Sequence, residues 1–186
     1  MNEFNAGILR GLLEFPTALT FTDGVLPCPL GSIAKVSAKS LGLVLGDSTG
    51  RDWLITLQFV RFSATVASAG RVCHHTSDAT YGYHCVTSTY AAALAYNNAG
   101  ISCHAVAAAG DYGVIQVGGL NGWAMTAAAA AIAIGNIMYP TATNEISVAT
   151  TDAQRVQKVG VAEVVDANGG ATTVGMIRLS PNGVGL

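Results

Sequence analysis

Short apolar runs alternate with glycine-containing turns along most of this 186-residue chain. From residue 41 onward the runs are rich in Val, Ile and aromatic residues, which strands favour over helices. Breaks that contain glycine separate them, for example at 81–82, 97–100, 118–119 and 168–170. Short strands at such spacing are typical of all-β sandwiches and barrels. We therefore expect a mainly β fold, a β-barrel or β-sandwich of short antiparallel strands.

The run at 53–62 shows the strand pattern most clearly. A period of two places Trp53, Ile55, Leu57 and Phe59 on one face of a strand. The other face is more mixed and carries Leu54, Thr56, Gln58, Val60 and Phe62. The full set of expected strands is 41–46, 53–62, 71–76, 83–89, 101–106, 113–117, 131–135, 145–150, 156–165 and 172–179. Alanine-rich stretches at 91–95 and 127–131 favour one or two short helices, because alanine has the highest helix propensity.

Residues 1–40 differ from the rest of the chain. The stretch 7–15 is expected to form a short helix that ends before Pro16, and prolines 27 and 29 interrupt regular structure after it. We therefore predict an irregular N-terminal arm over 1–40 and a β domain over 41–186. A weak internal similarity between 99–117 and 159–179 suggests that this domain contains two similar β units, at about 51–118 and 114–180.

The composition is apolar and poor in charge. Hydrophobic residues make up 51% of the chain and charged residues only 11%, against about 25% charged in an ordinary soluble domain. Such a surface suits a protein that works while packed against others. The net charge of -2 gives no reason to expect a nucleic-acid or membrane partner. The most apolar window, 124–134, is shorter than the roughly 20 residues that a bilayer requires.

The sequence contains no motif of a known catalytic class. It has no nucleophile elbow, phosphate-binding loop, dinucleotide-binding fingerprint or zinc-protease motif. Its carboxylates lie mostly at expected turns, where Asp and Asn cap the backbone. We therefore expect no catalytic residues, no cofactor and no enzymatic activity.

Cysteine and histidine gather between residues 73 and 104. Zinc takes both as ligands, and the candidate ligands are Cys73, His75, His84, Cys85, Cys103 and His104. Zinc-binding spacings are missing, however, and neighbouring residues of a strand point to opposite faces. We therefore expect no metal, with buried cysteines beside outward-facing histidines. The four cysteines allow two disulfides in three pairings, but the N-terminal stretch does not resemble a secretory signal, which favours reduced thiols.

Three ordered segments and one earlier segment resemble a known family. The segments are DYGVIQVGGLNGWAM (111–125), AIAIGNIMYPTA (131–142), VQKVGVAEVVDANGGATTVGMIRL (156–179) and DWLITLQFVRFSATVASAGRV (52–72). Their strand order and small-residue pattern are similar to those of the small β-rich capsid decoration (cement, or head-stabilising) proteins of tailed bacteriophages. The N-terminal forty residues and the cysteine–histidine region are not part of the pattern.

The resemblance implies a virion structural protein with no active site. Such a protein is made in the host cytoplasm, binds the outer surface of the capsid and stabilises the shell. Its partners are expected to be the major capsid protein and itself, as a homotrimer. One alternative is a head fibre or other receptor-binding module whose aromatic residues contact host glycans. A second is a small β-fold enzyme that uses the cysteine–histidine region.

Overall fold

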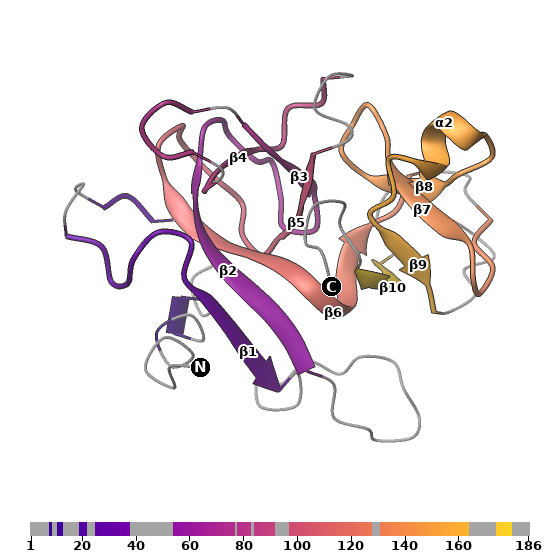
Figure 1. Ribbon diagram of the computed structural model, residues 1–186, viewed down its shortest axis with the longest axis horizontal. Coiled ribbons are helices and arrows are strands. Elements are labelled where there is room, and N and C mark those ends of the chain that lie inside the picture. Colours follow the sequence, from indigo (N-terminus) through magenta and orange to yellow (C-terminus); the bar gives the residue numbers. More distant parts are fainter. Residues whose placement is uncertain are drawn as a thin grey trace.

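The computed structural model describes residues 8, 11–12, 19–21, 25–37, 54–76, 78–82, 84–91, 97–127, 131–163 and 174–179. The fold is mainly β (Figure 1), which confirms the predicted class. The described elements are β1 (Ile33–Ser37), β2 (Leu54–Phe62), β3 (Val72–His75), β4 (Cys85–Thr87), β5 (Asn98–Ser102), β6 (Tyr112–Met125), β7 (Ile137–Pro140), β8 (Ile146–Val148), α2 (Asp152–Arg155), β9 (Gly160–Ala162) and β10 (Val174–Leu179). None of the helical residues in these ranges belongs to a segment long and apolar enough to cross a membrane.

Five strands close a barrel. The strand order β2-β4-β3-β5-β6 returns to its start because β6 also pairs with β2. Four of these five pairings are antiparallel, and β2 pairs with β4 in parallel. Closure pairs both edges of every barrel strand at least in part, so the barrel itself leaves little free edge.

A second, open sheet lies at one end of the barrel. It consists of the C-terminal half of β6 followed by β10, β9, β7 and β8, and all of its pairings are antiparallel. Figure 1 shows this sheet on the right, with α2 beside it. The described strands of the barrel lie within 54–118, and those of the second sheet lie within 119–179. These ranges are close to the two units expected at about 51–118 and 114–180. The two parts differ in form, however, because one is a closed barrel and the other is an open sheet. A duplication stays a prediction.

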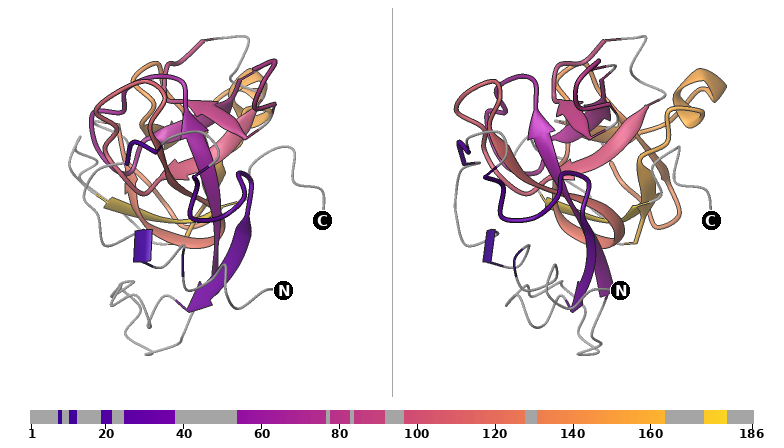
Figure 2. Two further views of the ribbon diagram at one scale, coloured as in Figure 1. Left: turned by 90° about the vertical axis from the view of Figure 1, so that its left-hand side faces the viewer. Right: turned by 60° about the vertical axis from the view of Figure 1, so that its left-hand side comes forward.

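Strand β6 belongs to both sheets. Its first half pairs with β2 and β5, and its second half, from Gly119 onward, pairs with β10. Figures 1 and 2 show it curving out of the barrel into the second sheet. The expected break at Gly118–Gly119 is therefore wrong: these glycines bend a continuous strand instead of ending it. At Gly119 φ is +83°, and a Cβ would collide with the Leu54 carbonyl oxygen, so only glycine fits without strain.

Two buried amide side chains hold this bend. Gln116 and Asn121 are both 0% exposed. Gln116 Nε2 donates to the carbonyls of Gly118 and Leu120, each at 3.0 Å, and its Oε1 accepts from Asn121 Nδ2 at 2.9 Å. Asn121 Oδ1 in turn accepts from the backbone N–H groups of Trp123 (3.0 Å) and Ala124 (2.7 Å). These amides replace the ladder bonds that the bent backbone cannot make.

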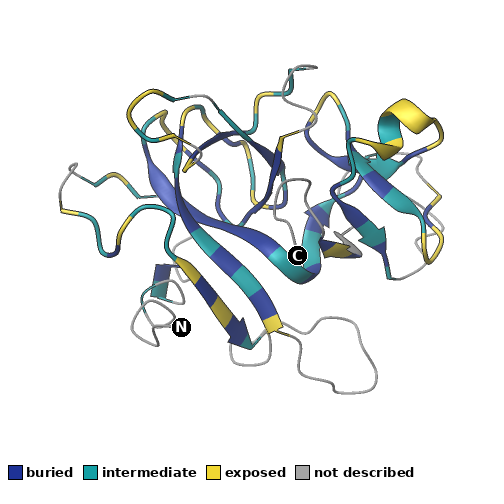
Figure 3. Ribbon diagram, in the orientation of Figure 1, coloured by how far each residue is buried: buried dark blue, intermediate teal, exposed yellow. Residues whose placement is uncertain are grey.

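Three apolar clusters lie among the described residues, and Figure 3 shows buried residues along most of the strands. All five barrel strands contribute to the barrel-interior cluster, which includes Val60 and Phe62 of β2. The N-terminal cluster covers the other face of β2 with Ile55, Leu57 and Phe59. The predicted two faces of this strand are therefore confirmed for its described residues. The junction cluster joins the second sheet to the barrel strands β3 and β5.

Part of the expected arm belongs to the core. Strand β1 pairs antiparallel with β2. Leu19 and Tyr112 exchange backbone hydrogen bonds of 2.8 and 2.7 Å, and Phe21 packs edge-on against Phe59 and Tyr112. The described residues of 19–37 thus cover the N-terminal cluster of their own barrel. The boundary at residue 40 stays a prediction.

Several expected strands shift in the structure. The strand expected at 101–106 lies earlier, as β5 at Asn98–Ser102, and 131–135 forms no strand and ends in a turn before β7. The short helix α2 was missed, although its start carries a capping box: Thr151 Oγ1 accepts from the Gln154 N–H, and Gln154 Oε1 accepts from the Thr151 N–H. The expected strand at 41–46 lies outside the described residues, as does most of each stretch expected to be helical.

The bend at Gly119 can be tested against a glycine of nearly the same conformation. Gly135 has φ +85°, but no atom lies within 4 Å of a Cβ built there. Gly135→Ala should therefore carry only the left-handed strain, about 1–2 kcal/mol. Gly119→Ala adds the collision with Leu54 and should lower the free energy of unfolding by about 3 kcal/mol or more. Urea denaturation measures both, and equal losses would contradict the close contact.

The amide network gives a second test. Asn121→Ala removes the partners of the Trp123 and Ala124 N–H groups and of the Gln116 side-chain oxygen, so we expect a loss of about 3 kcal/mol in unfolding free energy. Asn136→Ala is the matched control, because its side chain accepts one exposed N–H, from Ala133 at 2.8 Å. That control should lose about 1 kcal/mol at most. A comparable loss in both variants would show that the network does not hold the bend.

Candidate functional site

A polar pocket lies where the barrel loops meet the second sheet. Its volume is about 420 Å³. Thr65 and Ala67 come from the loop after β2, Ser88 and Thr89 follow β4, and the segment 143–145 forms the turn between β7 and β8. Arg71, just before β3, completes the lining. The pocket therefore exists only because the bend in β6 brings the second sheet against the barrel.

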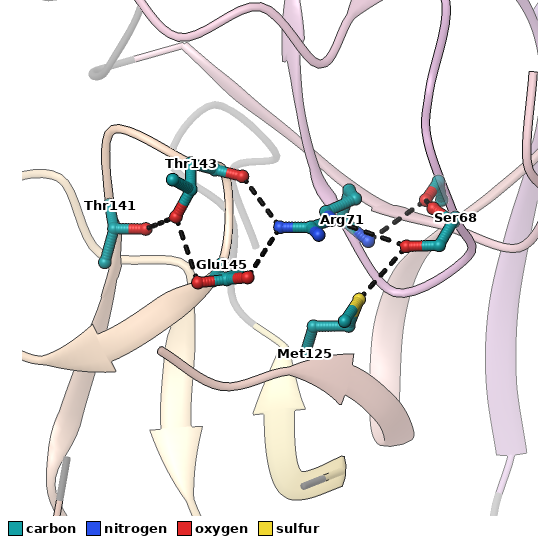
Figure 4. Close-up of polar contacts among 7 residues, drawn as sticks. Ser68, Arg71, Met125, Thr141, Thr143 and Glu145 are labelled. Carbon is teal, nitrogen blue, oxygen red and sulfur yellow. Dashed lines mark hydrogen bonds and ion pairs between the residues drawn. The ribbon is translucent and has the colours of Figure 1, made fainter. Parts of the chain in front are cut away.

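An ion pair spans the pocket. Arg71 Nη1 lies 2.8 Å from Glu145 Oε1 and donates a second bond of 2.9 Å to the Thr143 carbonyl (Figure 4). Thr143 Oγ1 donates to Glu145 Oε2 at 3.0 Å. The side chains of Arg71 and Glu145 are 19% and 12% exposed. The pair is thus largely withdrawn from water, whereas the other ion pairs between described residues are more exposed.

The turn that carries Glu145 is held against β3. Asn144 is 6% exposed and has φ +58°, a left-handed conformation that asparagine tolerates better than most residues. Its carbonyl accepts the Val72 N–H at 2.8 Å, and its Oδ1 lies 3.1 Å from Nε2 of the buried His74. The position of Glu145 in the pocket is therefore fixed by backbone and side-chain bonds together.

Sequence reasoning missed both Arg71 and Glu145. They lie 74 positions apart, and only the pairing of β3 and β8 with other strands brings them together. The available signal was weak: the chain has few charged residues, and each of these two is the first residue of an expected strand, 71–76 or 145–150. Charges flanking strands are common, so this signal does not single out a pair.

The six candidate metal ligands do not converge. Among the residues that the structure describes, no group of three or more His, Cys, Asp or Glu side chains is placed to hold a metal ion. Cys73 lies in the barrel-interior cluster, Cys103 packs against the N-terminal cluster, and His84 is exposed. Cys85 is buried on β4, and His75 is half-buried at the end of β3. The structure thus gives no support to the zinc alternative within its described part.

The expected outward histidines are only partly found. His74 and His104 are 0% and 1% exposed, so the prediction is wrong for both. His74 is buried because the turn at 143–145 and the ring of Tyr90, 6.2 Å away, cover it. The prediction assumed that side chains pointing away from the barrel interior are exposed to solvent. For His74 this is wrong, because the β7–β8 turn of the second sheet packs against it.

The cysteines are free thiols in the structure. Burial raises the pKa of the Cys73 thiol from 9.0 to about 12. Burial is also the main reason why the pKa of Cys103 is raised, with the nearby Cys73 adding to it. Burial raises the pKa of Cys28 as well, and Ser32 opposes that shift. Thiols held in the neutral form are poor nucleophiles and poor metal ligands.

Two of the expected turn carboxylates, Asp78 and Asp111, accept backbone N–H groups of turns, whereas Asp152 and Glu163 pair with Arg155 and Arg178. Asp78 Oδ1 accepts the N–H groups of Thr80 (2.8 Å) and Tyr81 (2.9 Å), and these bonds lower its pKa. Asp111 Oδ2 accepts the Ala108 N–H at 3.0 Å. Both carboxylates therefore cap turns.

The aromatic residues considered for glycan stacking serve several purposes. Tyr112 is buried and stacks on Phe59 at 6.0 Å, and Tyr81 lies under the Arg61 guanidinium, 4.4 Å from ring to Cζ. Trp123 packs against the N-terminal and junction clusters. Trp53, Tyr83 and Tyr96 lie outside the described residues. No aromatic side chain lines the polar pocket among the residues described.

Large apolar side chains are exposed at two places. Val25, Ile33 and Leu54, here called the β1–β2 set, are 73%, 50% and 64% exposed. Ile134 and Val156, in the second-sheet region, are 66% and 54% exposed. A chain with so little charge therefore also presents apolar side chains to solvent.

Comparison with known proteins gives little. No protein-family model matches the chain, and no curated protein sequence matches it. Among solved structures it is similar to the N base of head fiber gp8.5 in bacteriophage phi29, with a TM-score of 0.38 and 11% identity over 70% of this chain and 98% of that chain. A TM-score of 0.38 is too low to show a shared fold, so no conclusion is drawn from this similarity.

The buried thiol predicts a pH dependence of stability. Because the pKa of Cys73 is raised to about 12 in the folded protein, the unfolded chain loses its proton first, above pH 9. The contribution of the protonated Cys73 thiol to the free energy of unfolding is therefore complete below pH 9. It is lost as the pH rises towards 12, by up to about 1.4 kcal/mol per pH unit. Cys73→Ala removes this slope, which urea denaturation at several pH values would measure. Equal slopes in both proteins would contradict the shift.

Proposed function

We propose that this protein is a non-enzymatic structural component of a bacteriophage virion, which binds the outer surface of the capsid and stabilises the shell. The observation that carries the proposal is an apolar, weakly charged chain that leaves the β1–β2 set exposed. Such side chains are unfavourable in water and favourable when another protein covers them.

The sequence resemblance supports the proposal through the strands that it covers. The segment 111–125 contains the whole of β6, 131–142 contains β7, and 156–179 contains β9 and β10. The segment 52–72 contains β2. The similar pattern therefore lies in the framework strands of the barrel and of the second sheet, and not in peripheral loops.

The β1 edge gives the proposed contact its geometry. In the order of the described strands, β1 stands at one end of the ten-stranded arrangement. Its side chains alternate, with Ile33 and Lys35 exposed and Ala34 and Val36 buried. A strand of this kind can add a capsid strand through backbone hydrogen bonds while its exposed side chains contact the partner. The partners proposed are the major capsid protein and other copies of this chain, as a trimer.

Binding to the assembled shell alone would stabilise it by mass action. A protein that binds the closed lattice and not the free capsid subunit shifts the assembly equilibrium by its own binding free energy. This mechanism requires contact surface and no chemistry. The charge-poor composition suits it, because few charged groups would have to be desolvated in the contact.

The structure changes how the arm should be tested. The described residues of 19–37 cover the N-terminal cluster, so deletion of 1–40 would remove β1 and expose Phe59 and its neighbours. A truncated chain would lose capsid binding through unfolding as well as through loss of contact. Point substitutions at exposed side chains separate these two effects.

We predict that Ile33→Asp and Leu54→Asp each weaken binding to capsids by about tenfold or more, because each would bury a charge without a partner. Ile134→Asp and Val156→Asp are matched controls, with similarly exposed apolar side chains in the second-sheet region. Occupancy on capsids that lack the protein, measured by quantitative mass spectrometry, should fall only in the first pair. The melting temperature of the loaded capsids should fall with it.

Three results would overturn the proposal. The protein could be missing from purified virions of the phage that encodes it. The wild-type chain could fail to bind those capsids. Finally, circular dichroism could show that all four variants are folded while the controls Ile134→Asp and Val156→Asp lose as much binding as Ile33→Asp and Leu54→Asp. That result would rule out the β1–β2 contact.

A further inference from the structure

The polar pocket between the barrel loops and the β7–β8 turn has no part in the proposed capsid contact. None of its lining residues belongs to the β1–β2 set. Its volume of about 420 Å³ falls within the range of roughly 300–1,000 Å³ found for small-molecule sites. Its walls differ from those of an ordinary apolar ligand site, because hydroxyl, amide and charged groups predominate. The character of these groups indicates what could bind.

The charges of the pocket cancel. Arg71 and Glu145 are paired at 2.8 Å, and no other ionisable side chain is among the described residues that line the pocket. A phosphate or carboxylate ligand would be attracted by Arg71 but repelled by Glu145 at nearly the same distance, and an amine would meet the reverse. Displacing either partner would leave a largely buried charge unpaired, which is unfavourable. A neutral ligand is therefore favoured over an anion or a cation.

The pair still offers hydrogen-bonding capacity to a ligand. Arg71 uses Nη1 for Glu145 and Thr143 and directs Nε towards Ser68 Oγ at 3.4 Å. Within the described part of the chain, its Nη2 has no hydrogen-bond partner, so two N–H groups are available. Each Glu145 oxygen accepts one hydrogen bond, from Arg71 or from Thr143, and can accept another. A donor and an acceptor thus lie side by side, the arrangement that a hydroxyl group, itself donor and acceptor, satisfies on both sides.

The remaining lining supplies both hydroxyls and methyl groups. Thr65, Ser88, Thr89 and Thr143 each contribute a hydroxyl, and the threonines and Ala67 contribute methyl groups. Ser88 Oγ donates to the Thr65 carbonyl at 3.1 Å, which fixes part of the wall. A ligand that carries many hydroxyls on a carbon ring presents the complementary surface, with polar edges and C–H faces.

From this arrangement we propose that the pocket lined by Thr65, Arg71, Ser88, Thr89, Thr143 and Glu145 binds a neutral saccharide. The paired Arg71 and Glu145 form bonds to adjacent sugar hydroxyls, and the threonine methyl groups contact the ring. Because the pocket is polar and no aromatic side chain among the described residues stacks on the ligand, the affinity for one sugar unit is weak, with a dissociation constant of about 1 mM. Many copies on one particle would raise the total affinity through multivalency.

The test is a titration of the isotope-labelled protein, followed by the amide resonances in NMR spectra. The probes are glucose, galactose and N-acetylglucosamine, with inorganic phosphate and methylammonium as charged controls. We expect at least one of the sugars to shift the amides of 65–67, 88–89 and 143–145, and the charged controls to leave them in place. Capsid binding, measured separately, should not depend on these residues, so failure here and failure of the proposed function are distinguishable.

Two variants locate the site. Thr89→Val removes a hydroxyl that forms no hydrogen bond to any described residue, and it retains the shape of the side chain, so the fold should be unaffected. It should weaken sugar binding roughly five- to tenfold, the value of one hydrogen bond. Thr80→Val is the matched control, an exposed threonine outside the pocket, and should bind as the wild type does.

Three outcomes would overturn the proposal. The first is that none of the three sugars shifts the pocket amides at concentrations about a hundredfold above the expected dissociation constant. Phosphate or methylammonium shifts them and the sugars do not, which would indicate a charged ligand. Thr89→Val binds sugar as tightly as Thr80→Val does, which would place the binding elsewhere on the protein.

Discussion

The bend in β6 is the constraint on which the rest of the structure depends. One strand closes the barrel with its first half and begins the second sheet with its other half. The backbone can turn there because Gly119 adopts a left-handed conformation against the Leu54 carbonyl, where any Cβ would collide. Buried Gln116 and Asn121 replace the ladder bonds lost at the bend. Without this joint the second sheet would have no fixed position on the barrel, and the junction cluster could not form.

The polar pocket follows from the same joint. Arg71 belongs to the barrel side and Glu145 to the second sheet, so their 2.8 Å contact reports that the two parts are docked. The pair sits in a molecule with few charges, and it is largely shielded from water. A shielded pair of this kind is weak evidence for stability, because desolvation offsets the attraction. The pair lies beside the pocket, whereas the described cysteine and histidine side chains do not converge, and this is why the pocket carries the proposed saccharide site.

Sequence reasoning succeeded where a local pattern was sufficient. The alternation in 53–62 gave the correct two faces of β2: Ile55, Leu57 and Phe59 pack in the N-terminal cluster, and Val60 and Phe62 pack in the barrel interior. It failed at Gly118–Gly119, because glycine permits both a turn between two strands and a bend within one strand. These residues were expected to form a turn, but they bend β6. It failed also for His74 and His104, whose burial depends on neighbours distant in sequence. The strand expected at 131–135 does not form, since Gly135 lies in the turn that precedes β7.

The sequence by itself determined the class of fold. Short apolar runs with glycine turns bury their side chains as paired strands, and a charge-poor chain presents few charged groups on its surface. Those properties are local, and each can be read within about ten residues. The tertiary structure alone decided that five strands close a barrel, that β6 passes from one sheet to the other, and that Arg71 meets Glu145 across 74 positions. These three features depend on which strands pair with one another. Strand pairing is decided by the burial and hydrogen bonding of the whole chain, so the pattern of a single segment does not predict it.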